Sequence, residues 1–464
     1  MELTAGLVWL LVASALVLFM TPGLAFFYGG MTRAKSALNM MMMSFVAIGT
    51  VGIMWVLWGA SMATSNEDNF FQIFANPFSH FGLHNFTDPA DLLKVGYAAT
   101  FAIITVALIS GAVADRAKFS AWVIFTPIWA TLVYAPLAFM VWGGGLFSKD
   151  GWFGQTFAPV IDFAGGTVVH INAGVAGLIL VLIIGNRKGF GKDPNHRPHN
   201  VPFVMLGAAI LWFGWFGFNA GAAATVEQAG LIWINTLAAP AAAMLGWLAV
   251  ERFRDGHPTS LGAASGVVAG LVAITPACAN VSPLGAIALG VVAGVASALA
   301  VGLKFKFGYD DSLDVVGVHL VSGVVGTVAI GFLATPTQGT AGLFYGGGTS
   351  QLVAQALAAL LSIIFTAVMT FIIAFPIHKT MGFRVSQEQE VVGVDLSLHA
   401  ETAYEFGVGG HGGSFQPLHE LITGKPQGED AGAAAGAPAN TAATADVTSN
   451  GKKTAAAGKE SVGA

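Results

Sequence analysis

Eleven long apolar stretches constrain the fold of this chain more than any other feature of its sequence. They lie at about 5–30, 39–63, 95–114, 119–142, 163–185, 201–221, 230–250, 260–278, 284–304, 314–334 and 351–378. About 20 apolar residues are enough for a helix to cross a bilayer. Only 10% of the residues are charged, and the alternating pattern of an outer-membrane barrel is scarce. The sequence therefore predicts an all-α polytopic membrane protein with eleven transmembrane helices.

The Lys and Arg residues between these stretches predict the orientation. Loops on one side carry Arg33, Lys35, Arg116, Lys118, Arg187, Lys188, Lys192, Arg197, Arg252, Arg254, Lys304, Lys306, Lys379 and Arg384. Loops on the other side carry only Lys94 and Lys149. Since positive loops stay in the cytosol, the N-terminus is expected outside and the C-terminus inside. The first stretch lacks a positive flank before it, so we expect a retained span, with a cleaved signal peptide as the alternative.

Two of the stretches each contain a histidine in the same setting. In DFAGGTVVHINAGVAG, His170 follows Asp162 by eight residues; in DSLDVVGVHLVSGVVG, His319 follows Asp311 by eight. Glycines occupy the fourth and seventh positions after each histidine. A titratable ring within hydrocarbon is costly and is usually kept for function. At 1.5 Å of rise per residue, each histidine lies about 12 Å along its helix from its aspartate.

Ten of the stretches divide into two sets of five, at about 5–185 and 201–334, and the eleventh, 351–378, follows them. Because five is odd, the two sets must be inserted in opposite orientations, as inverted repeats. Each histidine is then about 12 Å from its own face of a hydrocarbon core about 30 Å thick. The two rings are therefore expected to meet near the middle of a membrane domain that covers residues 1–378.

A purely structural or metal-binding role fits the two histidines less well. A buried histidine is often a hydrogen-bonded structural residue, but the pairing across two repeats favours function. Zinc needs three or four protein ligands, and neither stretch offers another Cys, His or carboxylate at that depth. We therefore expect no metal, cofactor or catalytic residue, and a membrane enzyme is a distant alternative. The net charge of -5 says little about partners because the charges lie in loops and tail, and no nucleic-acid partner is expected.

The composition changes after the last stretch. Residues 379–424 are mixed and polar and include GVDLSLHAETAYEF, which we interpret as a cytosolic regulatory region. From about Lys425 to residue 464 the chain is rich in Ala, Gly, Thr, Pro and Lys without periodicity. Such a segment cannot bury enough apolar surface to fold, so a disordered tail is predicted.

Several motifs resemble the ammonium transporter/methylammonium permease/Rhesus family, and its ammonium transporter branch in particular. They are PGLAFFYGGMTRAK, FAIITVALISGAVADR, VWGGG, DFAGGTVVHINAGVAGL, FGFNAG, TPACANV, DVVGVHLVSG and GVDLSLHAETAY, which together cover about residues 5–405. VWGGG alone is weak, whereas DFAGGTVVHINAG with a matching second histidine is highly specific. The resemblance implies a multi-pass plasma-membrane transporter of ammonium and methylammonium, assembled as a homotrimer with one pore in each subunit.

The resemblance also implies roles for individual residues. His170 and His319 resemble the twin histidines of the pore, and Asp162 the acidic residue near its outer mouth, although a helix N-cap is an alternative for Asp162. The remaining positions are the aromatic gate, Phe101 and Phe218, and the outer recruitment site, Trp142, Phe101, Tyr97, Thr275 and Ala222. At Ala222 the family often has a serine, so we expect a weaker outer site in which cation–π attraction contributes more.

In the C-terminal region, Gly393, Asp395, His399, Glu401 and Tyr404 match the family's cytosolic pattern, which implies docking of a trimeric PII-type signalling protein. The expected function is transport: aromatic rings recruit ammonium, which loses a proton and crosses an apolar pore lined by the two histidines, with or without a relayed proton. An ammonium sensor is the alternative. Sensors of this type usually carry a fused signalling domain, for which 425–464 is too short and too biased.

Overall fold

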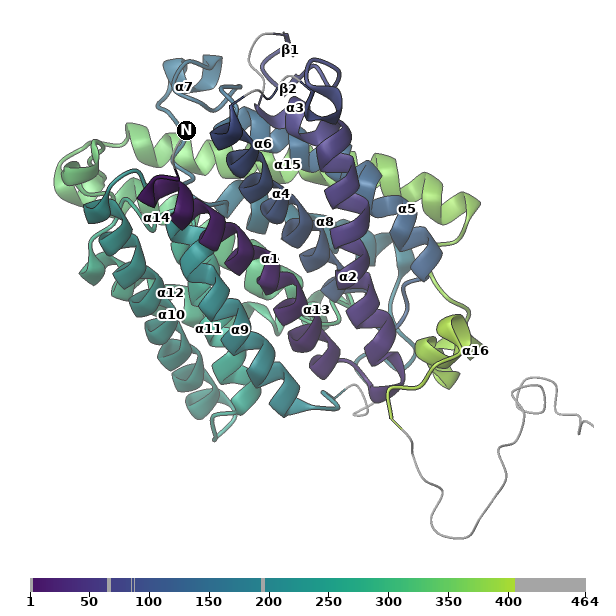
Figure 1. The fold of residues 1–464 in the computed structure, drawn as a ribbon. Helices are drawn as coiled ribbons and strands as arrows, with labels where there is room; N and C mark the ends of the chain where they lie inside the picture. Colours follow the sequence, from purple (N-terminus) through teal and green to yellow (C-terminus); the bar gives the residue numbers. More distant parts are fainter. Residues whose placement is uncertain (1–2, 65–67, 85, 87, 193–196, 405–464) are drawn as a thin grey trace, which may run out of the picture. The chain divides into compact units, whose positions relative to one another are not determined.

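Helices make up nearly all the regular structure in the computed structural model, which describes residues 3–64, 68–84, 86, 88–192 and 197–404 (Figure 1). The α-helices are α1 (Ala5–Met31), α2 (Ala37–Met54), α3 (Ala60–Thr64), α4 (Pro89–Ile109), α5 (Phe119–Trp129), α6 (Ala135–Trp142), α7 (Trp152–Thr156), α8 (Asn172–Ile184), α9 (Val201–Ala220), α10 (Val226–Arg254), α11 (Ser260–Ile274), α12 (Pro283–Ala300), α13 (Leu303–Phe307), α14 (Val321–Leu333), α15 (Ser350–Thr380) and α16 (Gln387–Val392). The π-helical turns are η2 (Trp55–Gly59), η5 (Ala130–Tyr134), η6 (Gly166–Ile171), η7 (Val316–Leu320) and η10 (Asp395–His399).

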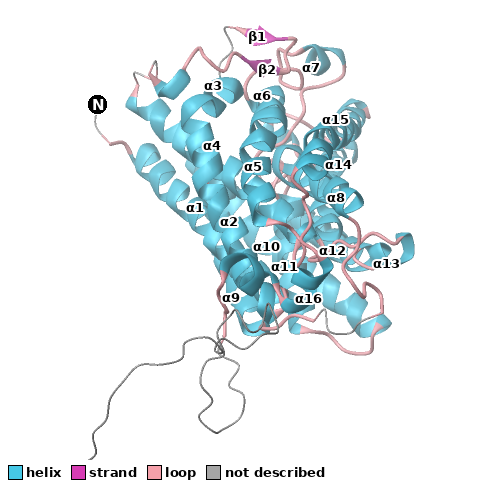
Figure 2. Cartoon of the chain, turned by 90° about the vertical axis from the view of Figure 1, so that its right-hand side faces the viewer, coloured by secondary structure: helices cyan, strands magenta, loops and turns pink. Residues whose placement is uncertain are grey.

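Shorter elements join the helices. The 3-10 turns are η1 (Ala34–Ser36), η3 (Phe81–Leu83), η4 (Ser110–Val113), η8 (Pro336–Gln338) and η9 (Leu343–Tyr345). Two short strands, β1 (Asn69–Phe70) and β2 (Phe74–Ala75), pair antiparallel with Asn69 opposite Ala75. Figure 2 shows the strands and α7 at one end of the helices and α16 toward the other.

The prediction of an all-helical polytopic membrane protein is confirmed. Within the described residues, ten helical segments are long and apolar enough to cross a membrane. The eighth predicted span, 260–278, forms the shorter α11, whose 15 residues end at Ile274. Thr275 is the C-cap residue, and Pro276 after it cannot continue the hydrogen bonding of a helix. The tail at 425–464 and the end of the predicted regulatory region lie outside the described residues.

Small residues allow the helices to pack closely. Gly290 and Gly294 lie one turn apart on α12, and a methyl group on either would collide with a backbone carbonyl of α10, at Ala239 or Ala243. Interfaces between membrane helices favour small residues for this reason, because lipid tails solvate larger apolar side chains as well as a neighbouring helix does. The glycine-rich sequence of α12 therefore sets how closely α10 and α12 approach.

A buried ion network closes the end of the molecule that carries the Lys- and Arg-rich loops, which we call the basic face. Arg187 lies 2.8 Å from Asp310 and 2.9 Å from Asp115, and Arg116 lies 3.7 Å from Asp310. Burial alone would raise the pKa of Asp310, but hydrogen bonds from Arg187 and the charge of Arg116 lower it to about 2. These residues come from loops of both predicted sets, so the network joins the two halves.

Candidate functional site

Each of the two histidines lies in a π-helical turn, His170 in η6 and His319 in η7. Isolated π-turns within α-helices occur frequently at functional sites. These turns were not among the features predicted from the sequence. In both repeats the turn comes directly before a regular helix, α8 or α14, so the two histidine settings match in structure as well as in sequence.

Asp162 caps the turn that contains His170. Its buried carboxylate accepts backbone N–H groups of Gly165 at 2.8 Å, Gly166 at 2.6 Å, Thr167 at 2.8 Å and Val168 at 3.3 Å, and also the Thr167 hydroxyl. Gly165 has φ of +119°, a conformation that a residue with a side chain rarely adopts. The Asp162 side chain therefore caps the start of the turn, although Gly165 and not Asp162 occupies the N-cap position.

Asp311 has the corresponding place before His319. Its carboxylate accepts the N–H groups of Val315 at 3.1 Å and Val316 at 2.7 Å. Burial and the neighbouring Asp314 carboxylate raise the pKa of Asp311 to about 6. Asp311 directly follows Asp310 of the basic-face network, whereas the backbone carbonyl of Asp162 accepts the indole N–H of Trp142 at the other end of the molecule. The two caps thus enter the structure from opposite faces.

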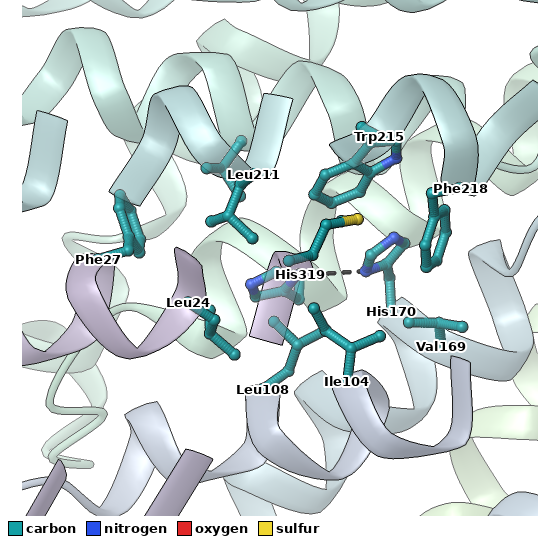
Figure 3. Close-up of a pocket in the computed structure, with 12 residues that line it drawn as sticks. Leu24, Phe27, Ile104, Leu108, Val169, His170, Leu211, Trp215, Phe218 and His319 are labelled. Carbon is teal, nitrogen blue, oxygen red and sulfur yellow. Dashed lines mark hydrogen bonds between the residues drawn. The ribbon is translucent and has the colours of Figure 1, made fainter. Parts of the chain in front are cut away.

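The structure brings the two imidazole rings together, as the spacing in the repeats predicts. Their Nδ1 atoms are 3.3 Å apart, and their ring centroids are 5.4 Å apart with 20° between the planes (Figure 3). Both rings are almost fully buried. One Nδ1 must carry the hydrogen and the other must accept it, because a neutral imidazole has one donor and one acceptor nitrogen. The buried Nε2 of His170 has no hydrogen-bond partner among the described residues.

A small cavity lies beside the two rings. Its volume is about 10 Å³, near the lower limit for holding one water molecule. The lining is apolar except for the imidazoles and the Trp215 indole: Met20, Leu24, Phe27, Ile104, Leu108, Val169, His170, Leu211, Trp215, Phe218, Val268 and His319. An ion in such a space would exchange its hydration shell for two imidazoles and one indole, which costs far more free energy than the same transfer of a small neutral molecule.

Aromatic rings close this cavity on the Trp142 side. Phe101 and Phe218 stack with centroids 4.1 Å apart and 21° between planes. Tyr97 contacts Phe101 edge-on at 4.8 Å, and its hydroxyl donates to the Phe218 carbonyl at 2.7 Å. Trp142 contacts Phe101 at 6.1 Å and is 40% exposed. Four of the aromatic positions named from the sequence thus form one group that runs from an exposed indole to the buried cavity.

Trp215 belongs to the site but was not among the residues predicted from the sequence. Its indole stacks on His170 with centroids 5.4 Å apart, and its N–H donates to the Thr275 hydroxyl at 2.8 Å. Thr275 is fully buried, and this hydrogen bond to Trp215 connects it to the site. The sequence contained a signal for this residue. Trp215 lies three residues before Phe218, so both side chains project from the same face of α9.

Ala222 lies exposed in the turn that follows α9. The adjacent Gly221 packs so closely on the Tyr97 ring that an added methyl group would lie 2.6 Å from it. No cluster of three or more His, Cys, Asp or Glu residues suited to a metal ion occurs in the part of the chain that the structure describes.

The predicted C-terminal residues lie against the basic face. The Asp395 carboxylate accepts the N–H groups of Leu38 at 3.0 Å and Asn39 at 2.7 Å, at the start of α2. His399 Nε2 lies 2.9 Å from the Asn39 amide oxygen, and Tyr404 lies 2.9 Å from His199. Gly393 has φ of +125° and packs against Lys35, where a side chain would collide. Of the five, Glu401 alone is exposed.

Comparisons with known proteins agree with this geometry. Residues 8–404 match the model of the Ammonium Transporter Family. The ammonium transporter of Mycobacterium tuberculosis (strain ATCC 25618 / H37Rv) is 52% identical over 433 residues, which cover 86% of this chain and 90% of the relative. Two solved structures are similar in fold. The Sensor Amt Protein has a TM-score of 0.77 at 26% identity, with 84% of this chain and 97% of that one covered. Saccharomyces cerevisiae Mep2 has a TM-score of 0.75 at 32% identity, with 83% and 88% covered.

Proposed function

This chain belongs to the Ammonium Transporter Family and is a multi-pass ammonium transporter of the cell membrane, and we propose that the ion loses a proton before its nitrogen passes His170 and His319. The observation that supports this step is the pairing of the two rings, which leaves a buried imidazole nitrogen unpartnered next to an apolar cavity. A buried polar atom of this kind needs a partner, and ammonia can supply either a donor or an acceptor.

The exposed Trp142 would receive the cation first. An ammonium ion is attracted to the face of an indole or phenyl ring by about 0.5–2 kcal/mol. The stacked Phe101 and Phe218 block the way beyond, so the rings must shift for the substrate to pass. Ammonium can release a proton and continue as a neutral molecule, whereas potassium cannot release its charge. The apolar lining of the cavity would therefore exclude potassium.

Replacing Ala222 by serine is expected to lower the half-saturation concentration for methylammonium uptake by up to about tenfold. The added hydroxyl can accept an N–H from the cation, a bond to a charged group worth about 1.5–3 kcal/mol at most and less in a wet vestibule. Uptake into liposomes measures it, with Ala223→Ser as the control. An unchanged or higher value for Ala222→Ser would mean that water or another residue already supplies the acceptor.

We also propose that the basic face lies in the cytosol, since positively charged loops remain on that side. His257, which is exposed beside Arg254 and Asp255, provides a test. A cysteine placed there, with Cys278 replaced by alanine, should resist an impermeant thiol reagent added outside intact cells. A cysteine at the exposed Asp150 should react. The reverse pattern would overturn the orientation.

The subunit is proposed to assemble as a homotrimer and to bind a trimeric PII-type protein through the segment that caps α2. Deleting residues 393–404 is expected to abolish capture of a PII-type protein, because the segment supplies both the docking surface and the Asp395 contacts with α2. Truncation after Lys425 is the control and should leave capture and transport nearly unchanged. Capture that survives the deletion would place the partner surface on the loops around Arg187 or Arg252.

Ammonium-dependent current through the purified protein in a supported bilayer tests the mechanism. A current shows that charge moves with the substrate, and uptake without current shows gas-like conduction of ammonia alone. A sensor is the second candidate, because one solved structure that resembles this fold is that of a Sensor Amt Protein. A sensor would bind ammonium with neither uptake nor current, which would contradict the proposed mechanism.

A further inference from the structure

The last membrane helix, α15, carries a row of buried polar side chains. Gln351, Gln355, Ser362, Thr366 and Thr370 recur at intervals of four or seven residues, and none is more than 5% exposed. Polar groups inside a membrane protein are costly unless they are hydrogen-bonded. α15 lies outside the two predicted sets of five, yet it contacts α8 and α14, the helices that continue from the two histidine turns. Figure 1 shows it passing obliquely behind the other helices.

Gln355 makes the densest set of contacts in this row. Its amide oxygen accepts the N–H of Ile161 at 2.9 Å, and its amide nitrogen donates to the carbonyl of the same residue at 2.7 Å. The nitrogen also donates to the Thr327 carbonyl at 3.1 Å, and the oxygen also accepts from Gln351 at 3.1 Å. The side chain thus uses both of its N–H donors and both acceptor positions.

These contacts lead directly to the site. Ile161 precedes Asp162, whose carboxylate caps the His170 turn and whose carbonyl accepts the indole N–H of Trp142 at 2.7 Å. Thr327 belongs to α14, which continues from the His319 turn. One amide therefore ties the backbone before Asp162 to the helix of the other histidine.

We propose that Gln355 is a positioning residue for the substrate-capture site, acting through the backbone of Ile161 and Asp162 on Trp142. The inference rests on the proposed function of Trp142. A buried glutamine that only stabilised the fold would change protein yield or melting temperature when replaced. Replacing a positioning residue would in addition weaken capture of the cation. The size of this effect would depend on how many of the original hydrogen bonds the new side chain can still make.

The first test is Gln355→Leu, which keeps a side chain of similar size and removes all four hydrogen bonds. The half-saturation concentration for methylammonium uptake into liposomes is expected to rise at least about fivefold, equivalent to one net hydrogen bond, with a smaller change in maximal rate. Thr370→Val is the matched control. It removes a buried bond on the same helix, the one from Trp129 at 2.9 Å, and should leave half-saturation unchanged.

The second test is Gln355→Glu, which remains informative if the leucine variant does not fold. A protonated glutamic acid can donate to the Ile161 carbonyl and accept its N–H, whereas an ionised one would face two carbonyl oxygens with a negative charge. Burial raises the pKa of a carboxyl group, so the change from the protonated to the ionised form of this side chain should fall within the working pH range. Relative to the parent at each pH, half-saturation should be near normal at low pH and raised at high pH.

The outcomes separate this inference from the proposed function. If the parent protein carries no ammonium or methylammonium, the proposed function fails. If the parent transports and Gln355→Leu keeps the parent half-saturation, Gln355 does not position the capture site. A ratio between Gln355→Glu and the parent that does not change with pH would overturn the inference as well, as would an equal rise in Thr370→Val.

Discussion

Alanine in place of either His170 or His319 is expected to reduce ammonium-dependent current at least about a hundredfold, the range over which positioned acid–base groups usually contribute. Each ring supplies the only hydrogen-bond partner that the structure gives to the Nδ1 atom of the other among the described residues. Removing one ring therefore ends any transfer of a proton along the pair. The measurement is current from each single variant in a supported bilayer, at equal protein density.

Selectivity should change together with current. Alanine enlarges a cavity of only about 10 Å³, and His170→Asp or His319→Glu would place a carboxylate there that attracts potassium by its charge. Potassium flux into liposomes should therefore rise in these variants. His378→Ala, at the end of α15 and away from the cavity, is the control. If His170→Ala and His319→Ala both carried ammonium at the parent rate and still rejected potassium, the two histidines would be structural.

Asp162→Ala is expected to abolish uptake of methylammonium and to lower the melting temperature as well. The change leaves four backbone N–H groups of a buried turn without their acceptor, and each unpaired buried group costs about 1–3 kcal/mol. Uptake into liposomes and thermal unfolding in detergent measure the two effects.

Asp162→Asn separates the charge of this side chain from its capping. Asparagine keeps one oxygen, which can still accept the N–H groups that one carboxylate oxygen holds, Gly165 and Gly166 or Thr167 and Val168. If the negative charge draws the cation, Asp162→Asn should lower the melting temperature less than Asp162→Ala and still lose most of the uptake. Uptake at the parent level in Asp162→Ala would show that neither the charge nor the cap matters for transport.

The sequence was sufficient to predict that His170 and His319 meet, because the prediction needed only a repeated spacing and an odd number of spans. The turns that contain them could not be predicted in the same way. A π-turn differs from an α-turn by one residue per hydrogen bond and has no strong local sequence signal. The early end of α11 was readable in principle, since Pro276 lies inside the predicted eighth span.

Contacts between distant elements were the least predictable part of the site. The polar side chains of α15 are visible in the sequence at regular spacing, but the sequence does not say that Gln355 bonds to Ile161, 194 residues earlier. The stacking of Trp215 on His170 likewise joins residues far apart in the chain and could not be predicted from the sequence. Both contacts depend on how helices far apart in the chain cross, and that crossing is set by close packing at small residues rather than by local propensity.

Because of the hydrogen bond between the two Nδ1 atoms, the protonation state of the histidine pair depends on the last proton that passed through it. The shared hydrogen belongs to one ring or to the other, so the pair has two arrangements. A proton that entered at one Nε2 and left from the other Nε2 would leave the pair in the arrangement opposite to the one it started in. The next proton could not follow in the same direction until the first arrangement was restored. A relay through this pair would therefore advance one charge at a time and require a recovery step, so its speed would depend on how fast the pair returns as well as on how fast it transfers.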